Sequence, residues 1–134
     1  MTKKTINPET VFNSVQYGFS QAVIKTGIRH LFLSGQVGIN KDEETIPGGL
    51  PAQTKLALEN LHSVIREAGG ELSDITMLRI YIKQGAESHE NQLVISSLLQ
   101  QYFPSEPPAS SWVIVTGLSL PEWLIEIEAE AILD

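Results

Sequence analysis

The sequence predicts an α+β domain in which one mixed β-sheet carries two helices packed on one of its faces. Two segments repeat their apolar residues with the period of a helix, and several others alternate apolar and polar residues as strands do. The chain has 134 residues, of which 42% are hydrophobic, which is enough for one ordinary core and too little for two. We therefore expect a single domain over residues 1–134.

The first part of the chain predicts a hairpin followed by a polar loop. Irregular structure is expected through Ser14, and a run of apolar and polar residues follows at residues 20–24. Gly27 supplies a turn before a second strand at residues 31–37, so the two runs are expected to pair with each other. Turn-forming residues over 40–49 then separate this hairpin from the first helix.

The middle of the chain predicts two helices. The first spans about Pro51 to Ala68 and ends at Gly69-Gly70, since glycine accepts the left-handed conformation of a helix cap. Ser88 is a suitable N-cap for the second, which spans roughly His89 to Tyr102 and ends before Pro104. The inward stripes are Ala57, Leu58, Leu61, Val64, Ile65 and Ala68 in the first helix, and Leu93, Val94, Leu98 and Tyr102 in the second.

Three further segments predict strands. Residues Ile75 to Lys83 alternate apolar with polar side chains, and residues Trp123 to Leu133 alternate isoleucine and alanine with glutamate. Between them, Pro107-Pro108 forms a stiff corner that leads into a buried strand ending at Val115. A rigid scaffold commonly displays binding groups at such a corner. Taken alone, the corner is most simply interpreted as a turn and the start of a strand.

The two helices can cover only one face of this sheet, so the opposite face must be solvated or buried against something else. We expect the helix-covered face to carry Leu31, Leu33, Leu78, Ile80, Ile82, Val113 and Val115. The opposite face would then carry Phe32, Met77, Tyr81, Trp112 and Ile114 beside Ser34 and Gln36. Such a face is too apolar for water, and a closed symmetric assembly is the usual way to cover it. The pattern therefore predicts a homo-oligomer.

The composition disfavours several classes of protein. Nine basic residues are scattered among sixteen acidic ones, and the net charge of −7 argues against a nucleic-acid partner. The chain has no cysteine and its three histidines, among them His62 and His89, are well separated, so no metal site is predicted. No apolar run has the length of a membrane span or the position of a secretory signal. We expect a soluble, cytoplasmic protein.

Fragments spread along the chain carry a resemblance to a known family. They are Ser34-Gly35-Gln36, residues 54–61 closing on Ala68-Gly69-Gly70, Ile80-Tyr81-Ile82, Tyr102-Phe103-Pro104 with Pro107-Pro108-Ala109, and Ile125 to Ala129. Each fragment alone is weak evidence, whereas their joint order and spacing covers nearly the whole chain. The sequence thereby resembles the Rid family, the YjgF-like enamine/imine deaminases.

The resemblance implies a chorismate-mutase-like (YjgF-like) topology and a homotrimer with small-molecule clefts between its subunits. Members that act as deaminases hydrolyse imines derived from amino acids, such as 2-iminobutyrate and 2-iminopropionate, without a metal or organic cofactor. An arginine directly after the Pro-Ala pair binds the substrate carboxylate, for which a guanidinium is well suited. A glutamate on the last strand and a backbone carbonyl position the attacking water. By this comparison Glu126 is the glutamate, and Trp112 supplies the carbonyl.

The sequence departs from the family pattern at the expected cleft. Ser110 stands in place of the arginine, Phe19 replaces a tyrosine, and Ser96 lies where many members carry asparagine. Trp112 fills a place often held by a small residue, and it has a second interpretation as a packing residue at an interface. These changes predict a small ligand that is less acidic or more aromatic. The expected ligand-binding residues are Phe19, Ser34, Gly35, Gln36, Ser110, Ser111 and Trp112.

Three functions are compatible with these residues. The first is a Rid-type small-molecule-binding protein in which arginine-dependent deamination is weak or lost. The second is a 2-iminobutyrate-type deaminase or related hydrolase that uses Glu126 to position water. The third, a ribonuclease or translational inhibitor activity that the family resemblance also suggests, fits the acidic composition poorly. A serine hydrolase is not expected, because Ser110 and Ser111 have no evident histidine and aspartate partners.

Overall fold

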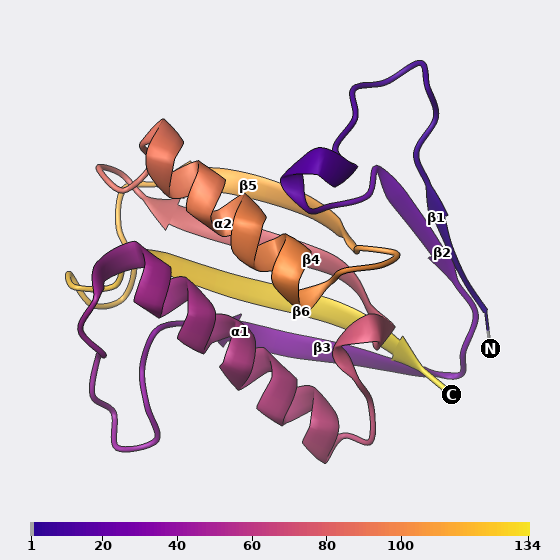
Figure 1. Cartoon of the computed structure of the whole chain (residues 1–134). Coiled ribbons are helices and arrows are strands. Elements are labelled where there is room, and N and C mark those ends of the chain that lie inside the picture. Colours follow the sequence, from indigo (N-terminus) through magenta and orange to yellow (C-terminus); the bar gives the residue numbers. More distant parts are fainter. Residues whose placement is uncertain (1) are drawn as a thin grey trace.

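A computed structural model describes residues 2–134 and contains one four-stranded sheet with two helices on one face (Figure 1). Its elements are β3 (Arg29–Gln36), α1 (Gly49–Glu67), β4 (Ile75–Lys83), α2 (His89–Tyr102), β5 (Ala109–Val115) and β6 (Ile125–Leu133). The strand order is β3-β6-β4-β5, with β4 and β5 parallel and the other neighbours antiparallel. The predicted α+β fold class, with a mixed sheet and both helices on one face, is confirmed.

A separate two-stranded sheet pairs β1 (Lys3–Ile6) with β2 (Ala22–Lys25) in antiparallel fashion. The predicted hairpin is therefore wrong, because β2 pairs with the start of the chain and β3 pairs with β6. The expectation of irregular structure through Ser14 likewise missed β1. The physical reason is length, since β6 offers β3 a partner of nine residues with an alternating buried face, whereas β2 has four residues.

A buried ion pair anchors the β1-β2 sheet to the rest of the fold. Lys25 donates from Nζ to Asp74 Oδ1 at 2.6 Å, and the Lys25 side chain is only 2% exposed. Asp74 ends the short 3-10 helix η2 (Leu72–Asp74), which leads into β4. Lys3 adds a hydrogen bond from Nζ to the carbonyl oxygen of Ser73 at 2.9 Å. The two lysines therefore fasten the smaller sheet to the segment that precedes a central strand.

Both helices lie close to their predicted ranges, and most of each predicted stripe faces the core. In α1 the predicted Ala57, Leu58, Leu61 and Ile65 are buried, whereas Val64, also predicted inward, is 44% exposed. In α2 the predicted Val94, Leu98 and Tyr102 pack partly buried against the core, the fully inward residues are Ile95, Ser96 and Leu99, and the predicted Leu93 is 49% exposed. The Ser88 N-cap is confirmed, since its hydroxyl accepts from the backbone N–H of Asn91 at 3.1 Å. Neither helix of the described chain is long and apolar enough to cross a membrane.

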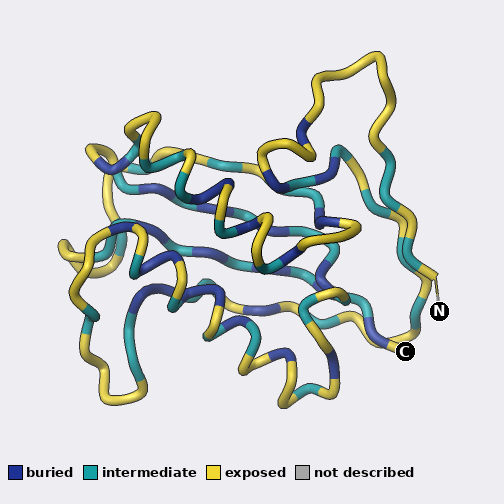
Figure 2. The backbone as a smooth tube through the Cα atoms, viewed as in Figure 1, coloured by how far each residue is buried: buried dark blue, intermediate teal, exposed yellow. Residues whose placement is uncertain are grey.

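The core lies between the helices and the two central strands, β4 and β6 (Figure 2). Alternate residues of both strands are buried as predicted, among them Leu78, Ile80, Ile82, Ile125 and Ile127. Their neighbours point to the opposite face of the sheet, which we call the open face. There Arg79 pairs with Glu130 at 2.7 Å, and the Tyr81 hydroxyl donates to Glu128. These pairs form a ladder of polar side chains along the centre of the open face, while α1 and α2 both lie on the other side of the sheet.

The edge strand β5 has the opposite phase to the prediction. In the parallel pairing with β4, Trp112 lies beside the buried Ile80 and so points toward the helices. Val113 points the other way and is 45% exposed. The expectation that Val113 and Val115 face the helices, with Trp112 and Ile114 opposite, is therefore wrong. The four residues from Trp112 are all apolar, so alternation alone does not determine the phase, and the register with β4 decides it.

Candidate functional site

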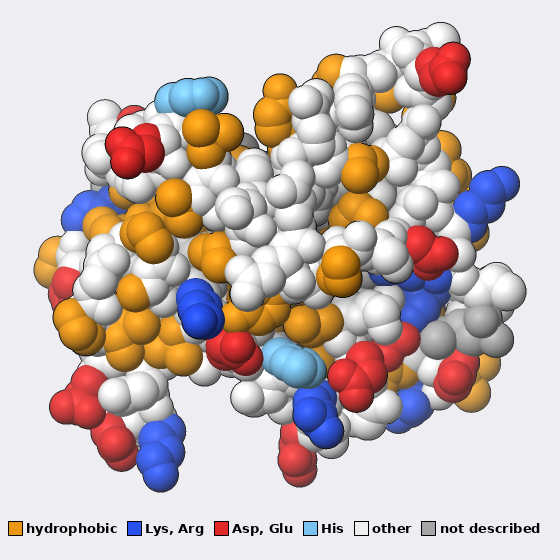
Figure 3. Space-filling model, in the orientation of Figure 1, with side chains coloured by type: hydrophobic (Ala, Val, Ile, Leu, Met, Phe, Trp, Pro, Cys, Tyr) orange, Lys and Arg blue, Asp and Glu red, His pale blue; other side chains and the backbone are white. Residues whose placement is uncertain are grey.

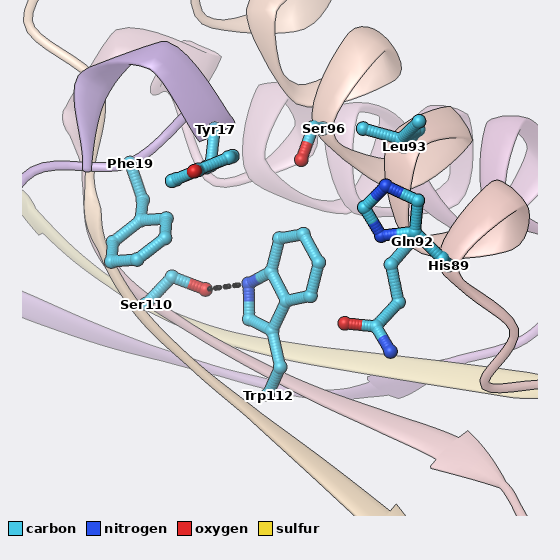
Figure 4. Close-up of a pocket in the computed structure, with 8 residues that line it drawn as sticks. All are labelled: Tyr17, Phe19, His89, Gln92, Leu93, Ser96, Ser110 and Trp112. Carbon is cyan, nitrogen blue, oxygen red and sulfur yellow. Dashed lines mark hydrogen bonds between the residues drawn. The ribbon is translucent and has the colours of Figure 1, made fainter. Parts of the chain in front are cut away.

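A pocket of about 420 Å³ opens on the helix side of β5, between α2 and the short 3-10 helix η1 (Val15–Tyr17). Its lining residues are Tyr17, Phe19, His89, Gln92, Leu93, Ser96, Ser110 and Trp112. Figure 4 shows Tyr17 and Phe19 on one side of the space, His89 and Gln92 on the other, and Trp112 between them. The volume is that of a site for a small molecule.

Local hydrogen bonds hold Phe19 against the start of β5. Ser14 is buried and donates from its hydroxyl to the carbonyl oxygen of Phe19 at 2.7 Å. Gly18 has a left-handed φ of 98° and lies so close to α2 that a side chain would not fit. Ser20 then donates from its backbone N–H to the carbonyl oxygen of Pro108 at 2.9 Å. The segment that carries Phe19 is thus bonded to the proline corner that leads into β5.

One stripe of α2 forms the opposite wall of the pocket. Its members are His89, Gln92, Leu93 and Ser96, and this spacing places them on one face of a helix. Ser96 is 7% exposed at the inner end of the stripe, whereas His89 is exposed at the first residue of the helix. The wall therefore runs from a buried hydroxyl to a solvated imidazole.

Ser110 and Trp112 belong to β5 and are joined by a hydrogen bond. The indole donates from Nε1 to Ser110 Oγ at 3.0 Å. The centroid of the Trp112 ring lies 6.2 Å from that of Phe19, with 49° between the ring planes. The indole is therefore held in one orientation, and the Ser110 hydroxyl keeps its own proton to donate to a ligand.

The pocket has no side chain that could pair with a ligand carboxylate as an arginine would. Among its lining residues, all of which lie in the described part of the chain, none is Lys, Arg, Asp or Glu. On the helix side of the molecule, basic and acidic side chains are interspersed (Figure 3). The described residues also contain no group of His, Asp and Glu that could hold a metal ion. The lining is therefore aromatic, hydroxylic and amidic.

A second group of predicted site residues lies on the open face. Glu126 pairs with Tyr81 in the register of β6 with β4 and is half-buried. Its carboxylate lies against the backbone of Gly35, the neighbour of Ser34 in β3. Burial raises the pKa of Glu126, and the nearby charge of Glu128 raises it further. Glu126 therefore binds a proton more readily than an exposed glutamate does.

Within one chain the sheet separates the two groups. The pocket holds Phe19, Ser110 and Trp112, whereas the open face holds Ser34, Gly35 and Glu126. Ser111 lies beside Arg79 in the parallel register and so belongs with the open face. Gln36 lies beside Ile127 after a break in the register of β3. The structure thus brings each group together but keeps the two apart.

Sequence reasoning does not find four residues that line the pocket, namely Tyr17, His89, Gln92 and Leu93. His89 is exposed at the first residue of α2 and also borders the pocket. A signal for three of them exists, because His89, Gln92 and Leu93 share a helical stripe with Ser96, which was already singled out. Tyr17 lies in a 3-10 turn of three residues, which leaves no periodic signal.

Gly35→Ala tests the contact between Gly35 and Glu126. A methyl group at Gly35 would overlap the Glu126 carboxyl group, so that side chain must move or the strands must part. We expect the free energy of unfolding to fall by about 1–2 kcal/mol in urea denaturation. Gly117→Ala is the matched control, because a methyl group there meets no atom within 4 Å. Its effect should stay below about 0.5 kcal/mol, and equal effects of the two substitutions would contradict the contact.

Comparison with known proteins gives consistent matches. The family model described as Endoribonuclease L-PSP matches residues 13–133. A structure from the conserved Rid protein family of Yersinia pestis is 41% identical, with a TM-score of 0.93, and covers 99% of this chain and 100% of that chain. A YjgF-family structure from Mycobacterium tuberculosis is 26% identical, with a TM-score of 0.65 and coverages of 98% and 100%. RidA from an Antarctic Psychrobacter is 25% identical, with a TM-score of 0.70 and coverages of 85% and 87%.

Proposed function

Because the chain belongs to the Rid family of YjgF-like proteins, we propose that it binds a small molecule in clefts between the subunits of a homotrimer. Arginine-dependent imine deamination is weak or lost in this protein. The observation that carries the proposal is Ser110, which stands where the deaminases of the family carry arginine. Its hydroxyl is bonded to the Trp112 indole, in a pocket that no lysine or arginine of the described chain lines.

The separation of the two residue groups supports a cleft between subunits. In one chain the sheet lies between Ser110 in the pocket and Glu126 on the open face, so a site that uses both needs a second copy. The open face also carries Phe32, which is 72% exposed, and Val113, which is 45% exposed. Apolar side chains of this size favour burial against another surface. A homotrimer would cover them and place the Glu126 of one subunit near the pocket of the next.

The expected loss of activity follows from the strength of the missing contact. A charge-assisted hydrogen bond contributes about 1.5 to 3 kcal/mol. Each 1.36 kcal/mol of lost transition-state binding lowers a rate about tenfold. Loss of the arginine therefore lowers the rate by roughly one to two orders of magnitude, and by more if the substrate loses its alignment.

Hydrolysis of 2-iminobutyrate by the unaltered protein tests the proposal. We expect no acceleration over the spontaneous reaction at enzyme concentrations that suffice for an arginine-containing deaminase. The ammonia or 2-ketobutyrate released is followed directly, and an arginine-containing family member assayed in parallel shows that the substrate was generated. Clear turnover by the unaltered chain would sink the proposal that the arginine-dependent reaction is lost.

A second candidate function is favoured by Glu126. A half-buried carboxyl group whose pKa is raised by burial and by Glu128 suits a general base that positions water. On this alternative the protein is an enamine/imine deaminase or related hydrolase, and Glu126→Ala abolishes a measurable turnover while the trimer stays intact. Glu130→Ala, which removes the partner of Arg79 on the same face, is the control and keeps the turnover. Unchanged activity in Glu126→Ala would exclude this mechanism.

The ribonuclease activity that the name of the family model suggests is not proposed for this chain. Binding to a phosphate backbone depends on lysine and arginine. The chain has nine basic against sixteen acidic residues, and none of the basic residues lines the pocket. The composition therefore favours a small-molecule ligand over a nucleic acid.

A further inference from the structure

We propose that the pocket beside Ser110 takes an aromatic amine, a ligand with a planar ring and an ammonium group but no carboxylate. This inference rests on the proposed function, since it names the chemical class of the ligand that the same pocket binds. It rests on the shape of the pocket, on the aromatic rings around it and on a lining that contains no Lys, Arg, Asp or Glu.

The aromatic rings favour a planar ligand. Three of the lining residues, Tyr17, Phe19 and Trp112, are aromatic, and Figure 4 shows them around the open space. The ring planes of Phe19 and Trp112 make an angle of 49°, and their centroids lie 6.2 Å apart. The two rings therefore form a corner at the side of the pocket. A ring placed in this corner can pack against both in the offset or edge-to-face geometries that aromatic groups prefer. The volume of about 420 Å³ admits one substituted ring.

The charges favour an ammonium group over a carboxylate. The faces of aromatic rings carry negative charge density and attract cations, most strongly at tryptophan. A ligand carboxylate would meet no lysine or arginine, and its uncharged side-chain partners would be the hydroxyls of Tyr17, Ser96 and Ser110 and the amide of Gln92. His89 is the one lining residue that could carry a positive charge, and it is exposed at the pocket mouth, where water screens it.

The proposed assembly strengthens the same preference. If Glu126 of the partner subunit lies across the cleft, the carboxylate adds an attractive partner for an ammonium group and a repulsive one for an acid. The net charge of −7 acts in the same direction at longer range. The aromatic ring faces, the partner's carboxylate and the net charge thus all favour the amine over the acid.

A titration with three ligands of similar shape tests the inference: 2-phenylethylamine, 2-phenylethanol and phenylacetate. Trp123→Phe leaves Trp112 as the only tryptophan, and quenching of its fluorescence reports ligand in the pocket. We expect the amine to bind at least about fivefold tighter than phenylacetate, with the alcohol between them. Calorimetry on the unaltered chain gives the same ranking without any substitution.

Two variants sharpen the result. Trp112→Leu should weaken the amine at least about fivefold in calorimetry, provided circular dichroism shows an unchanged melting curve. Ser110→Arg should reverse the ranking, so that phenylacetate binds tighter than the amine. Phenylacetate binding to the unaltered chain as tightly as the amine would overturn the inference while leaving the pocket as a ligand site. Failure of all three ligands to bind would overturn both the inference and the ligand pocket itself.

Discussion

Ser110→Arg should raise the rate of 2-iminobutyrate hydrolysis by about 10- to 100-fold. Ser110 lies on the helix side of β5, beside the buried Leu78, so a longer side chain there enters the pocket. The guanidinium would restore a bidentate partner for the substrate carboxylate, worth about 1.5 to 3 kcal/mol. At roughly tenfold per 1.36 kcal/mol, this corresponds to the expected gain. The measurement is the initial rate of ammonia release at equal protein concentration.

Ser63→Arg is the matched control for this gain. Ser63 is an exposed residue of α1 that does not line the pocket, so it adds the same charge away from the site. It should leave the rate unchanged. Because the Trp112 indole shares the pocket with the new side chain, the double variant Ser110→Arg, Trp112→Ala is assayed as well. No gain in either Ser110→Arg protein, or an equal gain from Ser63→Arg, would contradict the assignment of this position.

Lys25→Met should destabilise the fold by about 3 kcal/mol near neutral pH, because it leaves the Asp74 carboxylate buried without its partner. This value is at the low end for a buried ion pair, since the Asp74 side chain is 18% exposed. Lys4→Met, in the paired strand β1 and at an exposed residue, should cost less than about 0.5 kcal/mol. Both are measured by urea denaturation at one protein concentration, and similar losses in the two variants would contradict the anchoring role.

The same pair predicts a pH dependence. Burial would raise the pKa of Asp74, but hydrogen bonds from Lys25 and the Glu71 backbone outweigh it, so the pKa lies below its usual value. A carboxyl group whose pKa is lower in the folded state adds stability above its unfolded pKa, about 3.9, and loses it as the pH falls through the folded value. The difference in stability between the unaltered chain and Lys25→Met should therefore shrink below about pH 4. A constant difference down to pH 2 or so would contradict this account.

Strong periodicity explains which elements of the fold could be predicted. β4 and α2 were predicted with their observed ends. In β4 a regular alternation runs between clear turns, and in α2 a helical period runs between the Ser88 N-cap and a proline stop. β1 and the partner of β3 could not be predicted, since strand pairing depends on contacts between distant segments. The predicted phase of β5 was wrong for a related reason. Its apolar run fits either face, and only the register with β4 decides between them.

The residues of the candidate site could likewise be predicted only in part. The family resemblance led to Phe19, Ser110 and Trp112, and the structure places all three in one pocket. It also led to Glu126, which the structure places across the sheet from them. The segment from Ala109 to Val115 has two serines followed by four apolar residues, so no alternation indicates which side of the sheet Ser110 faces. Ser110 and Glu126 lie on opposite sides of the sheet in one chain, and only the proposed trimer would bring them together.

A crystal structure of the assembled protein tests whether the binding cleft forms between subunits. We expect a homotrimer in which the partner subunit's Glu126 faces the pocket lined by Ser110 and Trp112. We also expect that no lysine or arginine from either subunit comes within hydrogen-bond distance of a ligand bound beside Ser110. A monomer with a solvated open face would rule out the shared cleft, and a neighbouring cation that takes the place of the missing arginine would rule out the loss of the carboxylate partner.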